Sequence, residues 1–158
     1  MKEILLTKNT VTLVDDEDYE RLNQFKWHIS TGYAARYVHS IKKSSVYMHT
    51  EVLRHADKRY VVDHVDGNKL NNCKHNLRVC TQQQNSWNTN TPLRAASGYR
   101  GVYRNGAKWC ARIKHNNKVQ HIGNFNTSEE AAMAYDVAAL EYRGEFAKLN
   151  YPQSNCIR

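Results

Sequence analysis

A short segment near the middle of the chain, Asp63–Asn68, brings two carboxylates, a histidine and an asparagine together. Hydrolysis of a phosphodiester requires an activated water, a partner for the phosphate charge and a stabilised leaving oxygen. A histidine can act as the base near neutral pH, and a hard divalent ion prefers oxygen ligands. These residue types therefore favour metal-assisted cleavage of a phosphodiester.

The charge distribution points to a polyanionic partner. Between Gly67 and Ser128 the chain runs for 62 residues without an Asp or Glu, while it carries ten Lys and Arg. The first 66 residues hold ten acidic and ten basic side chains, so the net charge of +8 accumulates after them. Such an excess favours nucleic acid, mainly through release of condensed counterions. Because no apolar span, amphipathic lysine-rich helix or signal peptide is visible, we expect an intracellular protein without membrane contact.

The elements around Asp63 and His64 are expected to position both side chains. Residues 60–62 are typical of a strand that ends at this pair, and residues 77–80 of a return strand. Gly67 and Asn68 permit a tight reversal between the strands. Thr81 is expected to cap a helix that carries Asn85 in its first turns. This strand–loop–strand–helix order predicts that Asp63 and Asn85 approach each other.

The residues before this segment indicate a mixed α and β structure. The run of acids from Asp15 to Asp18 suits the N-terminus of a helix, so we interpret it as a solvated helix start and not as a metal site. Thr31-Gly32 is typical of a turn. The expected strands are residues 10–14, 26–30, 33–38 and 45–48, and the expected helix continues through residues 19–25.

The C-terminal part predicts a three-stranded antiparallel sheet on one helix. The strands are expected at residues 99–104, 108–115 and 118–125, with Asn116-Asn117 as a two-residue turn. Strict alternation places Trp109, Ala111 and Ile113 on an apolar face, and Lys108, Cys110, Arg112 and Lys114 on a basic face. A two-residue turn pairs Arg112 with His121 and Ala111 with Ile122. Thr127-x-x-Glu130 is a capping box for the helix, and Gly144 suits its end.

Several motifs in this part resemble the Apetala-type, ethylene-response-factor DNA-binding domain. They are Tyr99-Arg100-Gly101-Val102-Tyr103, Lys108-Trp109-x-Ala111-x-Ile113, Ile122-Gly123-x-Phe125, the alanine-rich run Glu129–Ala139 and Leu149–Pro152. The resemblance covers residues 98–152 and implies a sheet whose outer face enters the major groove of double-stranded DNA. The contact candidates by motif position are Arg100, Arg112, Lys114 and His121. Arg104 and Lys108 are added for their charge.

This sequence departs from the plant pattern in ways that change the target. The first hairpin is shorter and lacks the usual tryptophan, and Tyr103 stands where the family often has arginine. Arg112 replaces a common glutamate, and His121 a common tryptophan. Because these positions read bases, the plant target sequence does not carry over.

The middle of the chain resembles the HNH endonuclease motif in the version with asparagines at later positions. The matching residues are Val62–Asn68, Asn71-Asn72, His75–Thr81 and Gln84-Asn85, and residues 15–19, 26–27 and 48–49 look like the lead-in of phage-type HNH homing endonucleases. The resemblance implies that His64 is the general base, that Asp63 and Asn85 hold Mg²⁺ or Mn²⁺, and that Asn76 orients His64. Asn72 is expected to tie the loop together. Arg78 is either a phosphate clamp or a solvated strand arginine.

The other histidines and the cysteines are left outside the expected site. His49 is either structural or faces phosphate, and His75 is expected to be exposed. Cys73, Cys80, Cys110 and Cys156 form no Cys-x-x-Cys pair, and Cys73, His75 and Cys80 have no familiar metal-ligand spacing. We therefore expect reduced thiols.

Together these features predict an α+β chain that cuts duplex DNA. The expected organisation is a ββα-metal (HNH) nuclease domain at residues 1–88 with its motif core at 60–88, a linker at 89–97, the DNA-binding domain at 98–152 and a tail at 153–158. A single HNH site per chain predicts a nick per monomer, so a double-strand break would need a transient dimer or a second binding event. No small-molecule substrate is expected. A DNA-binding protein without catalysis and an RNA-binding protein remain the alternatives.

Overall fold

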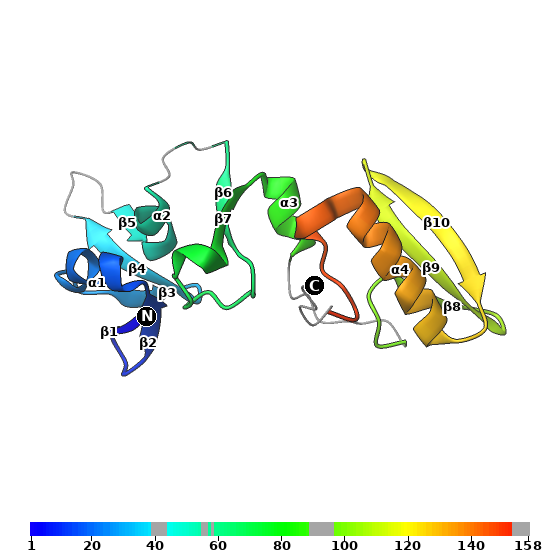
Figure 1. Ribbon diagram of the computed structural model, residues 1–158, viewed down its shortest axis with the longest axis horizontal. Helices are drawn as coiled ribbons and strands as arrows, with labels where there is room; N and C mark the ends of the chain where they lie inside the picture. Colours follow the sequence, from blue (N-terminus) through cyan, green and yellow to red (C-terminus); the bar gives the residue numbers. More distant parts are fainter. Residues whose placement is uncertain (39–43, 55–56, 58, 89–96, 153–158) are drawn as a thin grey trace, which may run out of the picture. The chain divides into compact units, whose positions relative to one another are not determined.

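The computed structural model describes residues 1–38, 44–54, 57, 59–88 and 97–152. Within them the chain forms two compact units, Met1–Asn85 and Ser86–Arg158 (Figure 1). The boundary falls three residues before the end expected at residue 88. Most of the expected linker and all of the expected tail lie outside the described residues.

The first unit combines small antiparallel sheets with short helices. A two-stranded sheet is followed by a helix, then by a three-stranded sheet in the order β3-β4-β5 and a second helix. Thr31 and Gly32 connect β3 to β4 and both have positive φ, as a tight hairpin turn requires. These elements are β1 (Lys2–Leu5), β2 (Val11–Val14), α1 (Asp16–Asn23), β3 (His28–Ser30), β4 (Tyr33–Val38), β5 (Ser44–Tyr47) and α2 (Met48–Leu53).

A single apolar core holds this unit together. Trp27 is its largest fully buried side chain, and the Trp27 indole donates a hydrogen bond to the carbonyl of Leu22 at the end of α1. The core also reaches the nuclease motif, because Val62 and Leu77 belong to it. The other buried members are Ile4, Leu6, Val14, Leu22, Ala34, Met48 and Val52.

The motif itself folds as a hairpin followed by a helix. Strands β6 (Val61–His64) and β7 (Leu77–Cys80) pair antiparallel, and the turn η1 (Lys74–Asn76) precedes β7. The helix α3 (Gln82–Trp87) follows, and Thr81 Oγ1 accepts a hydrogen bond from the backbone N–H of Gln84. This N-cap confirms the expected helix start at Thr81.

In the second unit, helix α4 packs on one face of a three-stranded sheet. The sheet has the order β10-β9-β8, and Thr127 and Glu130 form the expected capping box at the start of α4. Small alanines line the buried side of α4, so the helix lies close to the sheet. The elements are β8 (Val102–Asn105), β9 (Lys108–His115), β10 (Lys118–Phe125), α4 (Ser128–Arg143) and η2 (Gly144–Phe146).

Gly101 is required where the sheet and helix approach most closely. Its φ is +74°, and an added Cβ would lie 2.1 Å from the Tyr135 ring and 2.7 Å from the carbonyl oxygen of Arg112. No side chain fits in that space. The glycine therefore lets α4 sit against the strands.

Three details differ from the sequence expectations. Arg112 pairs with His121 as predicted, but Ala111 pairs with Gly123 because a bulge after His121 shifts the register, so the predicted partner Ile122 was wrong. Cys110 is buried although it alternates with exposed basic residues, and Arg112 Nε donates to its sulfur. Strand β1 and helix α2 had not been predicted, since both are short and stabilised by packing against distant residues.

Candidate functional site

Strand β6 delivers Asp63 and His64 to the interior of the first unit. Asp63 is 6% exposed and His64 is 4% exposed. Successive side chains of a strand point to opposite faces, so the two groups have different surroundings. The structure gives each a defined partner.

His64 stands at the end of a buried hydrogen-bond chain. His64 Nε2 lies 3.3 Å from Asn72 Oδ1. The Asn72 amide donates to Thr12 Oγ1 at 2.8 Å, and the Thr12 hydroxyl donates to the carbonyl of Leu70 at 2.7 Å. Because the Nδ2 of Asn72 is used by Thr12, its oxygen faces the imidazole. With the amide in this orientation, Nε2 is the ring nitrogen that donates a hydrogen to Asn72.

The surroundings keep His64 neutral near pH 7. Burial lowers its pKa, while the bond to Asn72 and the charges of Asp66 and Asp63 act in the opposite direction. The neutral imidazole is the form that accepts a proton. The Lys69 ammonium lowers the pKa further.

The two asparagines of the loop have exchanged their expected contacts. Asn76 was expected to orient His64, but its side chain accepts from the backbone N–H of Asp66 and donates to Asp66 Oδ1 and to the carbonyl of Asn71. Asn72, which was expected to tie the loop, contacts the imidazole and also fastens the loop to Thr12 of β2. The reason is that the loop docks on β2, where Asn72 N–H donates to the carbonyl of Leu13.

Asp63 forms a nearly buried ion pair with Arg78 on the neighbouring strand. Arg78 Nε and Nη2 lie 3.0 and 2.8 Å from Asp63 Oδ2. The pairing register of β6 and β7 sets these residues opposite each other. Arg78 is thus neither a solvated strand arginine nor a free cation in this structure.

Asn85 lies close to the same region. The pKa of the Cys80 thiol is raised overall, by burial and by the charge of Asp63. Arg78 and a hydrogen bond with the Asn85 backbone oppose this rise in part. Asn85 also lines a cavity together with Val61 and Val62 of β6. A carboxylate and an amide supply the hard oxygen donors that Mg²⁺ prefers.

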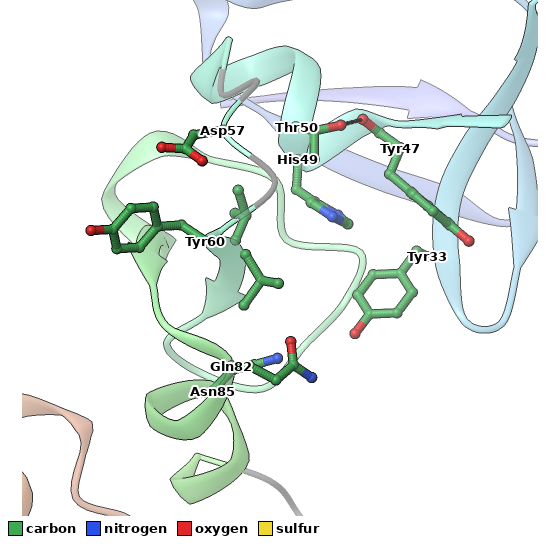
Figure 2. A pocket seen from close by; sticks show the side chains of 10 residues that line it. Tyr33, Tyr47, His49, Thr50, Asp57, Tyr60, Gln82 and Asn85 are labelled. Atoms are coloured by element: carbon green, nitrogen blue, oxygen red, sulfur yellow. Dashed lines mark hydrogen bonds between the residues drawn. The ribbon is translucent and has the colours of Figure 1, made fainter. Parts of the chain in front are cut away.

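Beside this region lies a cavity of about 420 Å³. Figure 2 shows His49 reaching it from α2 and Asn85 lining it from α3. Tyr33 and Tyr47 complete an aromatic wall, with ring centroids 5.1 and 5.5 Å from that of His49. The other lining residues are Thr50, Asp57, Tyr60, Val61, Val62 and Gln82.

His49 is the member of this region that the sequence analysis left out. Its ring packs edge-on against that of His64, with centroids 5.3 Å apart. Burial, and then the charge of His64, lower the His49 pKa to about 4. Among the described residues its buried Nδ1 has no hydrogen-bond partner. The adjacent Met48-His49 had been noted as part of a lead-in, but no local spacing links it to His64.

In the second unit, the sheet face opposite α4 carries the basic residues. Lys108, Arg112 and Lys114 share one side of β9 and are exposed, and His121 stands beside Arg112 on β10. All five acidic residues after residue 85 lie at or beyond the start of α4. The strands thus present positive charge with no acid of their own.

Two of the expected DNA contacts, Arg104 and Arg100, lie outside the group of basic residues on β9. Arg104 pairs with Trp109 in the β8–β9 ladder, and its guanidinium lies 4.9 Å from the centre of the Trp109 ring. It therefore shares the side of Trp109 and not that of Arg112. The backbone of Arg100 is fixed by Asn150, whose side chain accepts from its N–H and donates to its carbonyl. Asp136 in turn holds Asn150.

Comparison with known proteins agrees with both halves of this description. Residues 55–87 match the HNH endonuclease family, and residues 97–145 match the AP2 domain. An uncharacterized HNH endonuclease of Acanthamoeba polyphaga mimivirus is 33% identical over 145 residues, which cover 90% of this chain and 76% of the relative. The chain belongs to the HNH endonuclease family.

Other relatives match parts of this HNH endonuclease. Protein 3.8 of Escherichia phage T7 is 32% identical over 93 residues, 58% of this chain and 76% of that protein. An ethylene-responsive transcription factor of Arabidopsis thaliana is 50% identical over 68 residues, 40% of this chain but 16% of the plant protein. The HNH endonuclease thus joins a nuclease region to a DNA-binding AP2 domain. In the described part of the chain, no helix is long and apolar enough to cross a membrane.

Proposed function

We propose that this HNH endonuclease hydrolyses a phosphodiester of duplex DNA in a metal-dependent, homing-type reaction. The hairpin β6–β7 and helix α3 act as the ββα-metal unit, and the AP2 sheet selects the site. The observation that carries the proposal is the buried chain from His64 through Asn72 to Thr12, which fixes the orientation of the imidazole at the end of β6. A protein that only bound DNA would not need this arrangement.

His64 acts as the general base. Its Nδ1 takes a proton from the attacking water, and the imidazolium that forms keeps its Nε2–H on Asn72 Oδ1. Because Asn72 is itself fixed by Thr12, the ring does not rotate as its charge changes. General-base catalysis of this kind contributes roughly 10²- to 10⁴-fold to a rate.

The residues at the end of β6 and on α3 fit a hard divalent ion. Asp63 and Asn85 would hold Mg²⁺ or Mn²⁺, which would neutralise phosphate charge and stabilise the leaving oxygen. Arg78 now holds Asp63 Oδ2. A single carboxylate that already has a cationic partner is a weak site without substrate, so we expect tight binding of the ion when DNA phosphate completes the shell.

The AP2 sheet would enter the major groove with the face that carries Lys108, Arg112, Lys114 and His121. A two- or three-stranded ribbon fits that groove, and arginine there can contact guanine at two points. Arg100 would contact DNA at the edge of this face. Arg104, which lies with Trp109, would contribute charge to the phosphate backbone rather than read a base.

A single active site per chain leads to one nick per binding event. A double-strand break would then require a second event or a transient dimer. The substrate is double-stranded DNA, and no small molecule takes part.

The test is cleavage of a random duplex library in Mg²⁺ or Mn²⁺, with the new ends mapped by sequencing. Wild type should yield ends at recurrent sites, on one strand at each, and EDTA or His64→Ala should remove them. His28→Ala, a ring that stacks on Tyr37 away from the motif, is the matched control. Identical ends from wild type and His64→Ala would contradict the proposed base.

A further inference from the structure

A second group of metal-ligand side chains lies outside the proposed catalytic residues. Asp15, Cys73 and His75 each direct one donor atom toward the others, and these atoms all lie within 4.8 Å of one another. The three residues come from two segments nearly sixty positions apart. The group contains neither Asp63 nor Asn85.

We propose that Asp15, Cys73 and His75 bind a zinc ion that fastens the turn before β7 to the start of α1. A carboxylate, a thiolate and an imidazole are all ligands that Zn²⁺ accepts. A thiolate donor distinguishes this site from one for Mg²⁺, which takes oxygen ligands. Water fills the fourth position, because His75 is exposed and the site opens to solvent.

The distances between the three donor atoms suit a tetrahedral zinc ion once the side chains move slightly closer together. Bond lengths of about 2.0 to 2.3 Å place tetrahedral donor atoms roughly 3.3 to 3.7 Å apart. The present limit of 4.8 Å requires a movement of about 1 to 1.5 Å at most. The exposed side chain of His75 can supply it by rotation, whereas Cys73 is completely buried and keeps its place.

Existing contacts already bring the two segments together. The backbone N–H of Lys74, between the two ligands, donates to Asp15 Oδ2 at 2.7 Å. The ammonium of Lys74 forms ion pairs with Glu17 and Asp18. Burial and the neighbouring Asp15 carboxylate raise the pKa of the Cys73 thiol. The Asp15 carboxylate would repel the thiolate form of Cys73. A cation placed between the two groups would relieve that repulsion, and the thiol proton would pass to the solvent on binding.

The site would act on the position of the catalytic loop and not on the reaction itself. Cys73 follows Asn72, the partner of His64, and η1 carries Asn76, which holds Asp66. Zinc at this point would hold the loop against β2 and α1. The inference does not depend on nuclease activity, because its readouts are metal content and stability.

The test uses the full chain, purified without a histidine tag and stripped with a chelator. After addition of Zn²⁺ and gel filtration, wild type should retain a single zinc ion per chain by elemental analysis. Cobalt in place of zinc should give the near-ultraviolet absorption of a thiolate–cobalt bond. His75→Ala, whose exposed side chain is not needed for folding, should retain at least about tenfold less zinc, and Cys73→Ser should remove the cobalt band.

Cys110→Ser and His28→Ala are the controls, because they remove a buried thiol and a ring outside the group. At a hundredfold excess over Kd, zinc should raise the melting temperature of the first unit by roughly 10 to 20 °C in both controls but not in His75→Ala. No retained zinc in wild type, or equal zinc in wild type and His75→Ala, would overturn the proposal.

Discussion

His64 Nε2 lies 3.3 Å from Asn72 Oδ1, and this contact fixes which nitrogen of the ring can accept a proton. The amide of Asn72 cannot turn, because its nitrogen donates to Thr12. The orientation of the proposed base therefore depends on β2, which lies outside the HNH motif.

Replacing Asn72 should change the pH dependence of cleavage. Asn72→Asp keeps an acceptor at Nε2 and adds a negative charge, which raises the pKa of His64. Since the base works in its neutral form, the acid limb of the rate profile should move to higher pH. Asn72→Ala should lower the rate at least about tenfold because the ring orientation is lost. The measurement is single-turnover cleavage between pH 5 and pH 9.

Asn76→Ala is the comparison for that experiment. Asn76 contacts Asp66 and the carbonyl of Asn71, so its removal deletes hydrogen bonds that hold this partly buried loop. We expect a loss of about 1 to 3 kcal/mol in the free energy of unfolding, with the acid limb unmoved. A shift of the limb in Asn76→Ala but not in Asn72→Asp would restore Asn76 as the orienting residue.

The buried histidines should make the first unit less stable in mild acid. In the folded protein the pKa of His49 is about 4, against about 6.5 in the unfolded chain. Between these values the unfolded chain binds more protons, so the free energy of unfolding falls as the pH falls. From pH 7 to pH 5 the loss should be about 2 kcal/mol from His49, and the lowered pKa of His64 adds to it.

Urea unfolding at pH 7 and pH 5 measures this loss. His49→Gln removes the titrating group, so its stability should change much less between the two pH values. If His49→Gln lost as much stability as wild type, His49 would not be buried in its neutral form.

Removing Arg78 should make the first unit respond more strongly to magnesium. Arg78→Ala leaves the nearly buried carboxylate of Asp63 without its cation, at a cost of about 3 to 5 kcal/mol. A divalent ion at Asp63 would offset part of that cost. The rise in melting temperature on adding Mg²⁺ should therefore be larger in Arg78→Ala than in wild type. An equal rise in both would argue against metal binding at Asp63.

Gly101→Ala should destabilise the AP2 unit far more than Gly106→Ala. Both glycines have positive φ, so both substitutions carry a backbone cost of about 1 to 2 kcal/mol. A Cβ at residue 106 meets nothing within 4 Å, whereas at residue 101 it would overlap the Tyr135 ring. We expect a total loss of about 3 kcal/mol or more for Gly101→Ala. Chemical unfolding followed by circular dichroism compares the two, and equal losses would contradict the close packing.

The two faces of the AP2 sheet should differ in their effect on DNA binding. Arg112→Ala should weaken binding and reduce the salt slope by about one unit, and it should also relax the sequence preference. Arg104→Ala, on the side of Trp109, should leave the sequence preference unchanged. Affinities for selected and scrambled duplexes at several salt concentrations separate the two effects. Loss of preference in Arg104→Ala would place the recognition surface elsewhere.

Local patterns of the sequence determined most elements of both units. The alternation in residues 108–115, the two-residue turn at Asn116-Asn117 and the capping box at Thr127 depend on neighbours a few positions apart, and the structure has all three. The sequence did not predict the bulge after His121, because an ideal ladder and a bulged one have the same alternation of side chains up to that point. The same locality made the order of β6, β7 and α3 predictable.

The sequence by itself determined the kinds of residue near the proposed chemistry, namely Asp63, His64 and the asparagines that follow. Only the tertiary structure decided which asparagine faces His64, that Arg78 pairs with Asp63, and that His49 packs against His64. These contacts join residues 8 to 15 positions apart, and Thr12, which holds Asn72, lies 60 positions from it. They follow from how the loop docks on β2 and how α2 packs beside it, and no spacing along the chain encodes which buried polar groups then meet.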